Sequence, residues 1–192
     1  MARRCWILLL VCVLLAGIES CGGVGGYPPP TSAKDSGSGV EPPPAAGTED
    51  DGIVTATQVD PREERRWLTL SDYEGDLDGD GSPEKLQLLV RADRSPEDGE
   101  IAWDDGQPWL LLVADGGDYY PVFSKYVQLG AVYFSVYEDS EGQAEIEVLV
   151  TTGAGLGLSA VTFNTVKRGY RVEEVYASKG DNLRHTSFQP YR

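Results

Sequence analysis

The chain has 192 residues, 41% of them hydrophobic, and a formal net charge of −15 at pH 7. This length is enough for one modest domain with additional segments, and so acidic a chain lacks the basic patches of a nucleic-acid-binding protein, so we expect no nucleic-acid partner. All three cysteines lie within the first 21 residues, so no disulfide is expected in the rest. His185 is the single histidine, which rules out histidine-based metal clusters and disfavours a Ser-His-Asp triad.

The N-terminus has the pattern of a signal peptide over residues 1–20. Arg3 and Arg4 precede an apolar run over residues 5–18, which is short for a membrane span. The run ends in Ile18-Glu19-Ser20-Cys21, which resembles the lipobox of bacterial lipoproteins, although Glu19 departs from the usual small or apolar residue. The resemblance implies diacylglyceryl transfer to Cys21, cleavage before it and N-acylation, for example with palmitate. It also implies an extracytoplasmic protein, lipid-anchored to a bacterial membrane. The alternative is a simple secretory signal cleaved nearby.

Residues 21–57 are rich in Pro, Gly and Ser and poor in bulky apolar residues, with Pro-Pro-Pro at 28–30 and again at 42–44. Such a composition buries too little apolar surface to offset the entropy cost of ordering. We predict a disordered tether that holds a domain away from the membrane.

The domain is predicted to span residues 58–192 and to be all-β. Asp60-Pro61-Arg62-Glu63 has the pattern of a helix start, for one or two turns ending near Arg66. From Trp67 onward, short segments of period two alternate with turn signals. The predicted strands cover residues 67–73, 85–90, 109–113, 119–124, 132–137, 145–150, 156–163 and 170–176. We expect a compact antiparallel two-sheet domain or a partial β-propeller, because a closed propeller needs at least four blades.

The loop at 76–84 carries the clearest chemical signal in the chain. Asp76, Asp78 and Asp80 occupy alternate positions, so a curled backbone can direct their carboxylates into one concavity. Gly81 permits the sharp turn, and the Ser82 carbonyl and Glu84 are placed to complete a shell. Ca²⁺ prefers six to eight oxygen ligands in such a flexible site. Crowded like charges repel, which a bound cation relieves. The alternative is a solvated acidic turn without metal.

The loop does not fit an EF-hand, because position twelve counted from Asp76 is Gln87 and the flanks read as strands. It resembles instead the calcium loops of FG-GAP and VCBS-type repeats, found in integrin-like propeller blades. The resemblance covers the loop and its flanking strands, and Glu84 stands where Asp is more usual. It implies one Ca²⁺ site. The implied side-chain ligands are Asp76, Asp78, Asp80 and Glu84, with Ser82 as a backbone ligand.

Two further patterns are a glycine-rich segment and a set of aromatic residues. The segment 153–157, Gly-Ala-Gly-Leu-Gly, lacks the Lys-Ser/Thr of a phosphate loop, and Leu158 breaks the dinucleotide-binding fingerprint, so we expect a loop or bulge. Trp103, Tyr119 and Tyr120 are candidate binding aromatics for a protein or carbohydrate ligand. The alternative for the tyrosines is that they pack in the core.

Together these patterns predict a lipid-anchored cell-envelope protein. Its Ca²⁺-stabilised β domain is expected to act in binding or scaffolding at the surface, rather than as an enzyme. One alternative is a small envelope enzyme or enzyme accessory that uses clustered carboxylates. Another is a metal-free binding module that uses a Tyr/Trp face.

Overall fold

The computed structural model describes residues 51–63, 66–178, 185, 187–188 and 191, and over these residues the protein is all-β with antiparallel sheets. The predicted signal peptide, Cys21 and most of the predicted tether lie outside the described residues. No helix among the described residues is long and apolar enough to cross a bilayer. The strands are β1 Ile53–Thr55, β2 Leu68–Gly75, β3 Glu84–Val90, β4 Asp93–Arg94, β5 Ile101–Ala102, β6 Gly106–Asp115, β7 Asp118–Gln128, β8 Ala131–Glu138, β9 Ala144–Thr151, β10 Leu156–Asn164 and β11 Gly169–Ala177.

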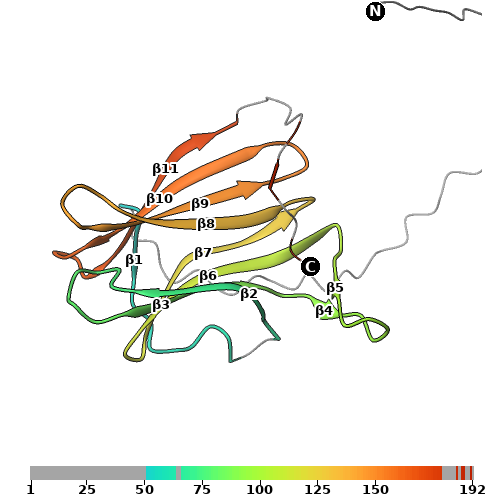
Figure 1. Cartoon of the computed structure of the whole chain (residues 1–192), viewed down its shortest axis with the longest axis horizontal. Helices are drawn as coiled ribbons and strands as arrows, with labels where there is room; N and C mark the ends of the chain where they lie inside the picture. Colours follow the sequence, from blue (N-terminus) through green and yellow to red (C-terminus); the bar gives the residue numbers. More distant parts are fainter. Residues whose placement is uncertain (1–50, 64–65, 179–184, 186, 189–190, 192) are drawn as a thin grey trace, which may run out of the picture. The chain divides into compact units, whose positions relative to one another are not determined.

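The strands form two main sheets that are not closed into a barrel (Figure 1). The five-stranded sheet has the order β1-β11-β10-β9-β8, and the four-stranded sheet has the order β2-β3-β6-β7. β4 and β5 pair only with each other and form a third, two-stranded sheet. Consecutive strands are mostly neighbours, as expected for a chain of short hairpins. The prediction of an all-β fold from two-residue periodicity is confirmed.

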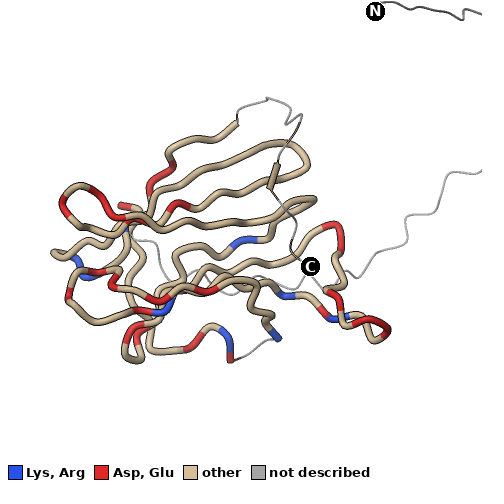
Figure 2. The backbone as a smooth tube through the Cα atoms, in the orientation of Figure 1, with Lys and Arg blue, Asp and Glu red and all other residues tan. Residues whose placement is uncertain are grey.

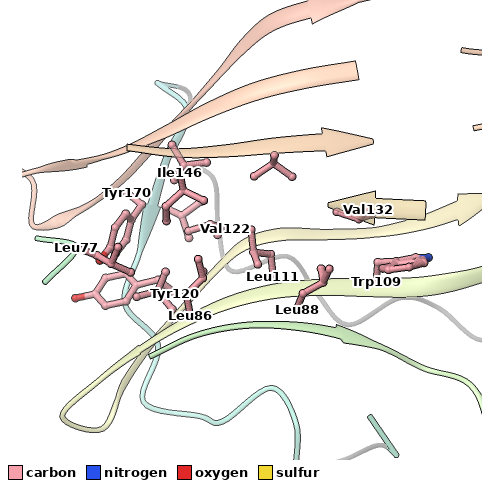
Figure 3. Close-up of a cluster of buried hydrophobic side chains, with 14 of the residues drawn as sticks. Leu77, Leu86, Leu88, Trp109, Leu111, Tyr120, Val122, Val132, Ile146 and Tyr170 are labelled. Atoms are coloured by element: carbon pink, nitrogen blue, oxygen red, sulfur yellow. The ribbon is translucent and has the colours of Figure 1, made fainter. Parts of the chain in front are cut away.

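One hydrophobic core joins the inner faces of the two sheets (Figure 3). Leu88 and Leu111 of the four-stranded sheet pack in the same cluster as Val132, Ile146 and Val161 of the five-stranded sheet, and each is at most 1% exposed. Burial of these side chains supplies the main drive for the sheets to pack, at about 25 cal/mol for each Å² removed from water.

β6 is a central strand of the four-stranded sheet and contains a continuous apolar run at residues 109–113. It pairs with β3 on one side and β7 on the other. Trp109, Leu111 and Val113 point into the core between the sheets. Leu110 and Leu112 alternate with them and form a second, smaller cluster on the opposite face with Leu89, Trp67 and Tyr119. Both faces of β6 are therefore covered, which explains the absence of polar alternation in its sequence.

The folded part begins before residue 58, the predicted boundary of the tether. Ile53 and Val54 are 0% and 4% exposed, and Val54 pairs with Tyr170 of β11. Thr57 continues to the other sheet, where its amide and carbonyl each bond to Tyr119 at 2.9 Å. β1 has only three residues, which is too few to show a two-residue period. The prediction for this segment therefore depended on composition, which indicated a tether.

The helix predicted at Asp60 is wrong over the described residues, which form a turn there. Glu63 N–H donates to the Asp60 carbonyl at 3.2 Å, which closes the turn. The Asp60 carboxylate accepts from the Arg62 amide and also from the Arg62 guanidinium, as near as 2.6 Å. Local side-chain bonds of this kind compete with helix formation.

Candidate calcium site

The acidic loop joins two paired strands of the four-stranded sheet. Gly75 at the end of β2 pairs with Glu84 at the start of β3, so residues 76–83 form the connection. Gly79 and Gly81 have φ angles of 81° and 90°, in the left-handed region that favours glycine. The two glycines let the backbone curl around its own carboxylates. Figure 2 shows acidic residues along this loop and in other loops at the same end of the sheets.

The carboxylates hold the loop by accepting hydrogen bonds from its amides. Asp76 accepts from Gly79 N at 2.7 Å and from Gly81 N at 3.0 Å. Asp78 accepts from Asp80 N at 3.0 Å through Oδ1. Such bonds from short acidic side chains to amides a few residues on are typical of tight turns. The curled shape predicted from the alternate aspartates is therefore present.

Three of the predicted ligands come together. Asp76, Asp78 and Glu84 each place a carboxylate oxygen within 4.8 Å of the other two. Asp80 is not part of this group, and its Oδ1 accepts instead from Ser82 N at 2.7 Å. The role of the Ser82 carbonyl stays a prediction. The grouped donors are hard oxygens, which suit Ca²⁺.

Glu84 is the unusual member of the group, because its side chain is only 1% exposed. Its Oε2 accepts from Leu77 N at 2.5 Å and from Asp78 N at 3.2 Å. Its Oε1 has no hydrogen-bond partner among the described residues. Burial raises the pKa of Glu84, the amide of Leu77 opposes this shift, and the charge of Asp78 adds to it. A buried carboxylate with one free oxygen is costly unless a proton or a cation binds it.

Asp78 has a similar electrostatic environment. Burial raises its pKa, the amide of Asp80 lowers it, and the charges of Asp80, Asp115 and Asp76 raise it further. Asp115 was not predicted as a site residue. It follows Ala114, which pairs with Lys85, so the end of β6 brings its charge beside the start of β3. The nearness of Asp115 to the acidic loop follows from the pairing register of β3 and β6, which the sequence does not reveal.

Leu77 was likewise not predicted to have a structural role. It lies between two predicted ligands, yet its side chain is 2% exposed and belongs to the core that joins the sheets (Figure 3). Tyr120 and Tyr170 lie in the same cluster. Burial and the charges of Glu84 and Asp78 raise the pKa of Tyr170 strongly. The signal that could have identified Leu77 as a core residue is that it is the single leucine within an acidic loop.

A polar cavity of about 580 Å³ lies beside the loop. Asp76, Asp78 and Gly79 form part of its wall, and the turns at 141–144 and 163–166 of the five-stranded sheet form the rest. The group of carboxylates is therefore accessible to solvent on the side of Asp76, and the buried Glu84 forms its inner side.

The predicted binding aromatics have different environments. Trp103 is 42% exposed and stacks on buried Trp109, with ring centroids 6.0 Å apart. Tyr119 is half-buried beneath the Arg62 guanidinium, which lies 5.6 Å from the ring centroid. Tyr120 is 6% exposed and makes an edge contact with Tyr170 at 5.1 Å. The burial of Tyr120 counts against a binding role and places it in the core.

The glycine-rich segment forms a turn between β9 and β10. Thr152 Oγ1 accepts from Ala154 N at 3.2 Å and from Gly155 N at 3.0 Å, and a strand follows at Leu156. A register shift between Leu158 and Ser159 marks a bulge. The prediction of a loop or bulge is therefore confirmed.

Comparisons of the chain with protein-family models, with curated proteins and with solved structures find no match. The case for a cation site therefore depends on the geometry of this loop alone.

Proposed function

We propose that this protein is a lipid-anchored component of a bacterial cell envelope, attached through Cys21. Its β domain is stabilised by one Ca²⁺ bound in the acidic loop, and the domain acts in binding or scaffolding outside the cytoplasm. The lipobox-like segment before Cys21 supports the anchor. A hard-cation site suits an extracytoplasmic module, because calcium is abundant outside cells and such modules bind it with Kd of about 10⁻⁴–10⁻³ M.

The observation that carries the calcium proposal is the free Oε1 of buried Glu84. Two hydrogen bonds to its other oxygen hold this carboxylate in place, and the carboxylates of Asp76 and Asp78 lie within 4.8 Å. Without a cation, three like charges repel in a partly desolvated site. A divalent cation replaces that repulsion with coordination. Asp76, Asp78 and Glu84 are the residues that would hold it.

Calcium binding is expected to appear as folding stability, because the unfolded chain has no preformed site. For a Kd of about 1 mM, 10 mM Ca²⁺ stabilises the folded state by about 1.4 kcal/mol. A domain of this size then gains roughly 3–6 °C in Tm.

The test is a set of thermal melts of residues 22–192, a piece that contains every residue the structure describes. Each sample is melted in 10 mM Ca²⁺ and in EDTA. Asp78→Asn keeps an oxygen to accept from Asp80 N but loses the charge. We expect its Tm in EDTA to equal or exceed that of the wild type, and its calcium response to disappear. Asp72→Asn, at an exposed position on β2, is the matched control and retains the full response.

Equal melting curves for the wild type in Ca²⁺ and in EDTA contradict the proposal, and the loop is then a solvated turn. A calcium response that survives in Asp78→Asn also contradicts it, because the stabilising ion then binds elsewhere.

A further inference from the structure

A second cavity, of about 640 Å³, lies between the sheets. One wall is the part of β7 from Pro121 to Val127, and the other is formed by β9, β10 and β11. Its apolar lining includes Val122 and Val127 from one sheet and Val148, Val150 and Val172 from the other. Pockets of about 300–1,000 Å³ with mostly apolar walls and a few polar groups are typical ligand sites. No residue of the acidic loop lines this cavity.

Small residues at inward-facing positions create the space. Gly157 of β10 lies directly opposite Val150 of β9, and Ser159 lies opposite Val148. Directly opposed residues place their side chains on the same face of a sheet, so Gly157 and Ser159 face the cavity with the two valines. A Cβ added at Gly157 meets only the Tyr176 carbonyl, at 3.9 Å. The hollow opens to solvent where the exposed residues Lys125 and Glu174 line it, so a ligand can enter from that side.

The two charged residues that line the cavity come from opposite sheets. Lys125 pairs with the core residue Trp109, and Glu174 pairs with Ser159, so each lies on the inward face of its own sheet. Both are exposed, while the valines deeper in the cavity are not. Neither charge takes part in an ion pair among the described residues. The Lys125 ammonium lies over the Phe123 ring, 5.8 Å from its centroid.

We propose that this cavity binds a single-chain zwitterionic lipid. The acyl chain lies against the valines, where it removes apolar surface from water. The anionic phosphate of the head group meets Lys125, and the cationic amine meets Glu174. The presence of one positive and one negative side chain in the lining disfavours a head group of one sign, and the net charge of −15 disfavours free anionic lipids further.

The test is isothermal titration of residues 22–192 with 16-carbon lysophosphatidylcholine below its critical micelle concentration, in EDTA. We expect binding of one lipid per chain, at least about tenfold tighter than that of palmitate or monopalmitoylglycerol. Lys125→Met and Glu174→Gln are each expected to reduce this preference about tenfold. Equal affinity for the three lipids in the wild type overturns the proposal.

Filling the cavity gives an independent test. Gly157→Leu is expected to abolish binding with an unchanged or higher Tm, because its added side chain enters open space. Ser159→Val is a second filling variant on the same face. Ala160→Leu adds similar bulk on the outer face of β10, opposite Glu147 and Glu173, and is expected to bind as the wild type does. Binding that persists in folded Gly157→Leu and Ser159→Val, or its absence from the wild type, overturns the proposal.

Discussion

Buried Glu84 accepts a hydrogen bond from the Leu77 amide at 2.5 Å, which ties the first residue of β3 to the acidic loop. The Leu77 side chain is itself 2% exposed and packs in the core shared by both sheets. The loop is therefore coupled to the core through its backbone and through one side chain. A change in the charge of its carboxylates is expected to alter the stability of the whole domain.

Leu77→Ala tests this coupling. Truncating a buried leucine leaves a cavity and costs about 2–5 kcal/mol of unfolding free energy. We also expect weaker calcium binding, because the loop loses its anchor. Urea unfolding with and without Ca²⁺ measures both effects. Leu129→Ala, at a position 61% exposed, is the control and should change stability little. Normal calcium binding in Leu77→Ala would show that the loop holds its shape without the core.

Glu84→Gln tests two effects of the buried Glu84 charge: the destabilisation that it causes without calcium and the calcium binding that it supports. Burial disfavours the charged form of Glu84 and raises its pKa. We therefore expect the variant to be at least as stable as the wild type in EDTA and less stable in 10 mM Ca²⁺. Glu74→Gln, at an exposed position on β2, is expected to follow the wild type in both. A Glu84→Gln protein with a full calcium response would remove Glu84 from the ligand set.

Asp60 gives a pH-dependent prediction away from the loop. The hydrogen bond from the Arg62 side chain lowers the pKa of Asp60. The contribution of this pair is therefore fully present above the unfolded pKa of about 3.9 and is lost as the pH falls through the lower folded pKa. We expect Asp60→Asn to be less stable than the wild type at pH 7, and the difference to shrink as the pH falls below about 3.9. A stability difference that does not depend on pH would contradict this account.

The two stacked tryptophans should contribute very differently. Trp109 is 1% exposed and Trp103 is 42% exposed. We expect Trp109→Ala to cost about 3–5 kcal/mol of unfolding free energy, and Trp103→Ala about 1 kcal/mol from lost stacking. Urea unfolding of both variants measures the difference. Similar losses would mean that Trp103 is a structural residue, which weakens it as a candidate for ligand contact.

The lipid anchor is tested by expressing the full chain in a bacterial host with labelled palmitate. We expect the label on the wild-type protein and none on Cys21→Ala. Cys12→Ala is the matched control, since Cys12 lies within the predicted signal peptide. Equal labelling of the wild type and Cys21→Ala would place the lipid elsewhere or show that the signal is not a lipobox.

Local pattern predicted most of the strands, because alternation and turn residues act over a few neighbouring positions. It failed where an element depends on distant partners. β1 is short and gains its stability by pairing with β11, across more than a hundred residues of sequence. The turn at Asp60 is held by Arg62, whose guanidinium also donates to Gln87 on β3 at 2.5 Å.

The sequence also predicted only part of the candidate calcium site. The spacing of the acids predicted that the carboxylates of Asp76, Asp78, Asp80 and Glu84 converge, and among these only those of Asp76, Asp78 and Glu84 form the group. Spacing did not show that Asp80 would turn to Ser82, since that depends on the exact curl of the backbone. The cavity at Gly157 depends on which residues face inward across three strands, and one sequence does not reveal that register.

The most direct test of the calcium site is equilibrium dialysis of residues 22–192 against labelled Ca²⁺, with Asp76→Asn and Asp78→Asn combined in a second sample. We predict one Ca²⁺ bound per wild-type chain, with a Kd of about 10⁻⁴–10⁻³ M, and no saturable binding by the double variant. Absence of saturable binding by the wild type, or equal binding by both proteins, would contradict the account of the acidic loop as a calcium site.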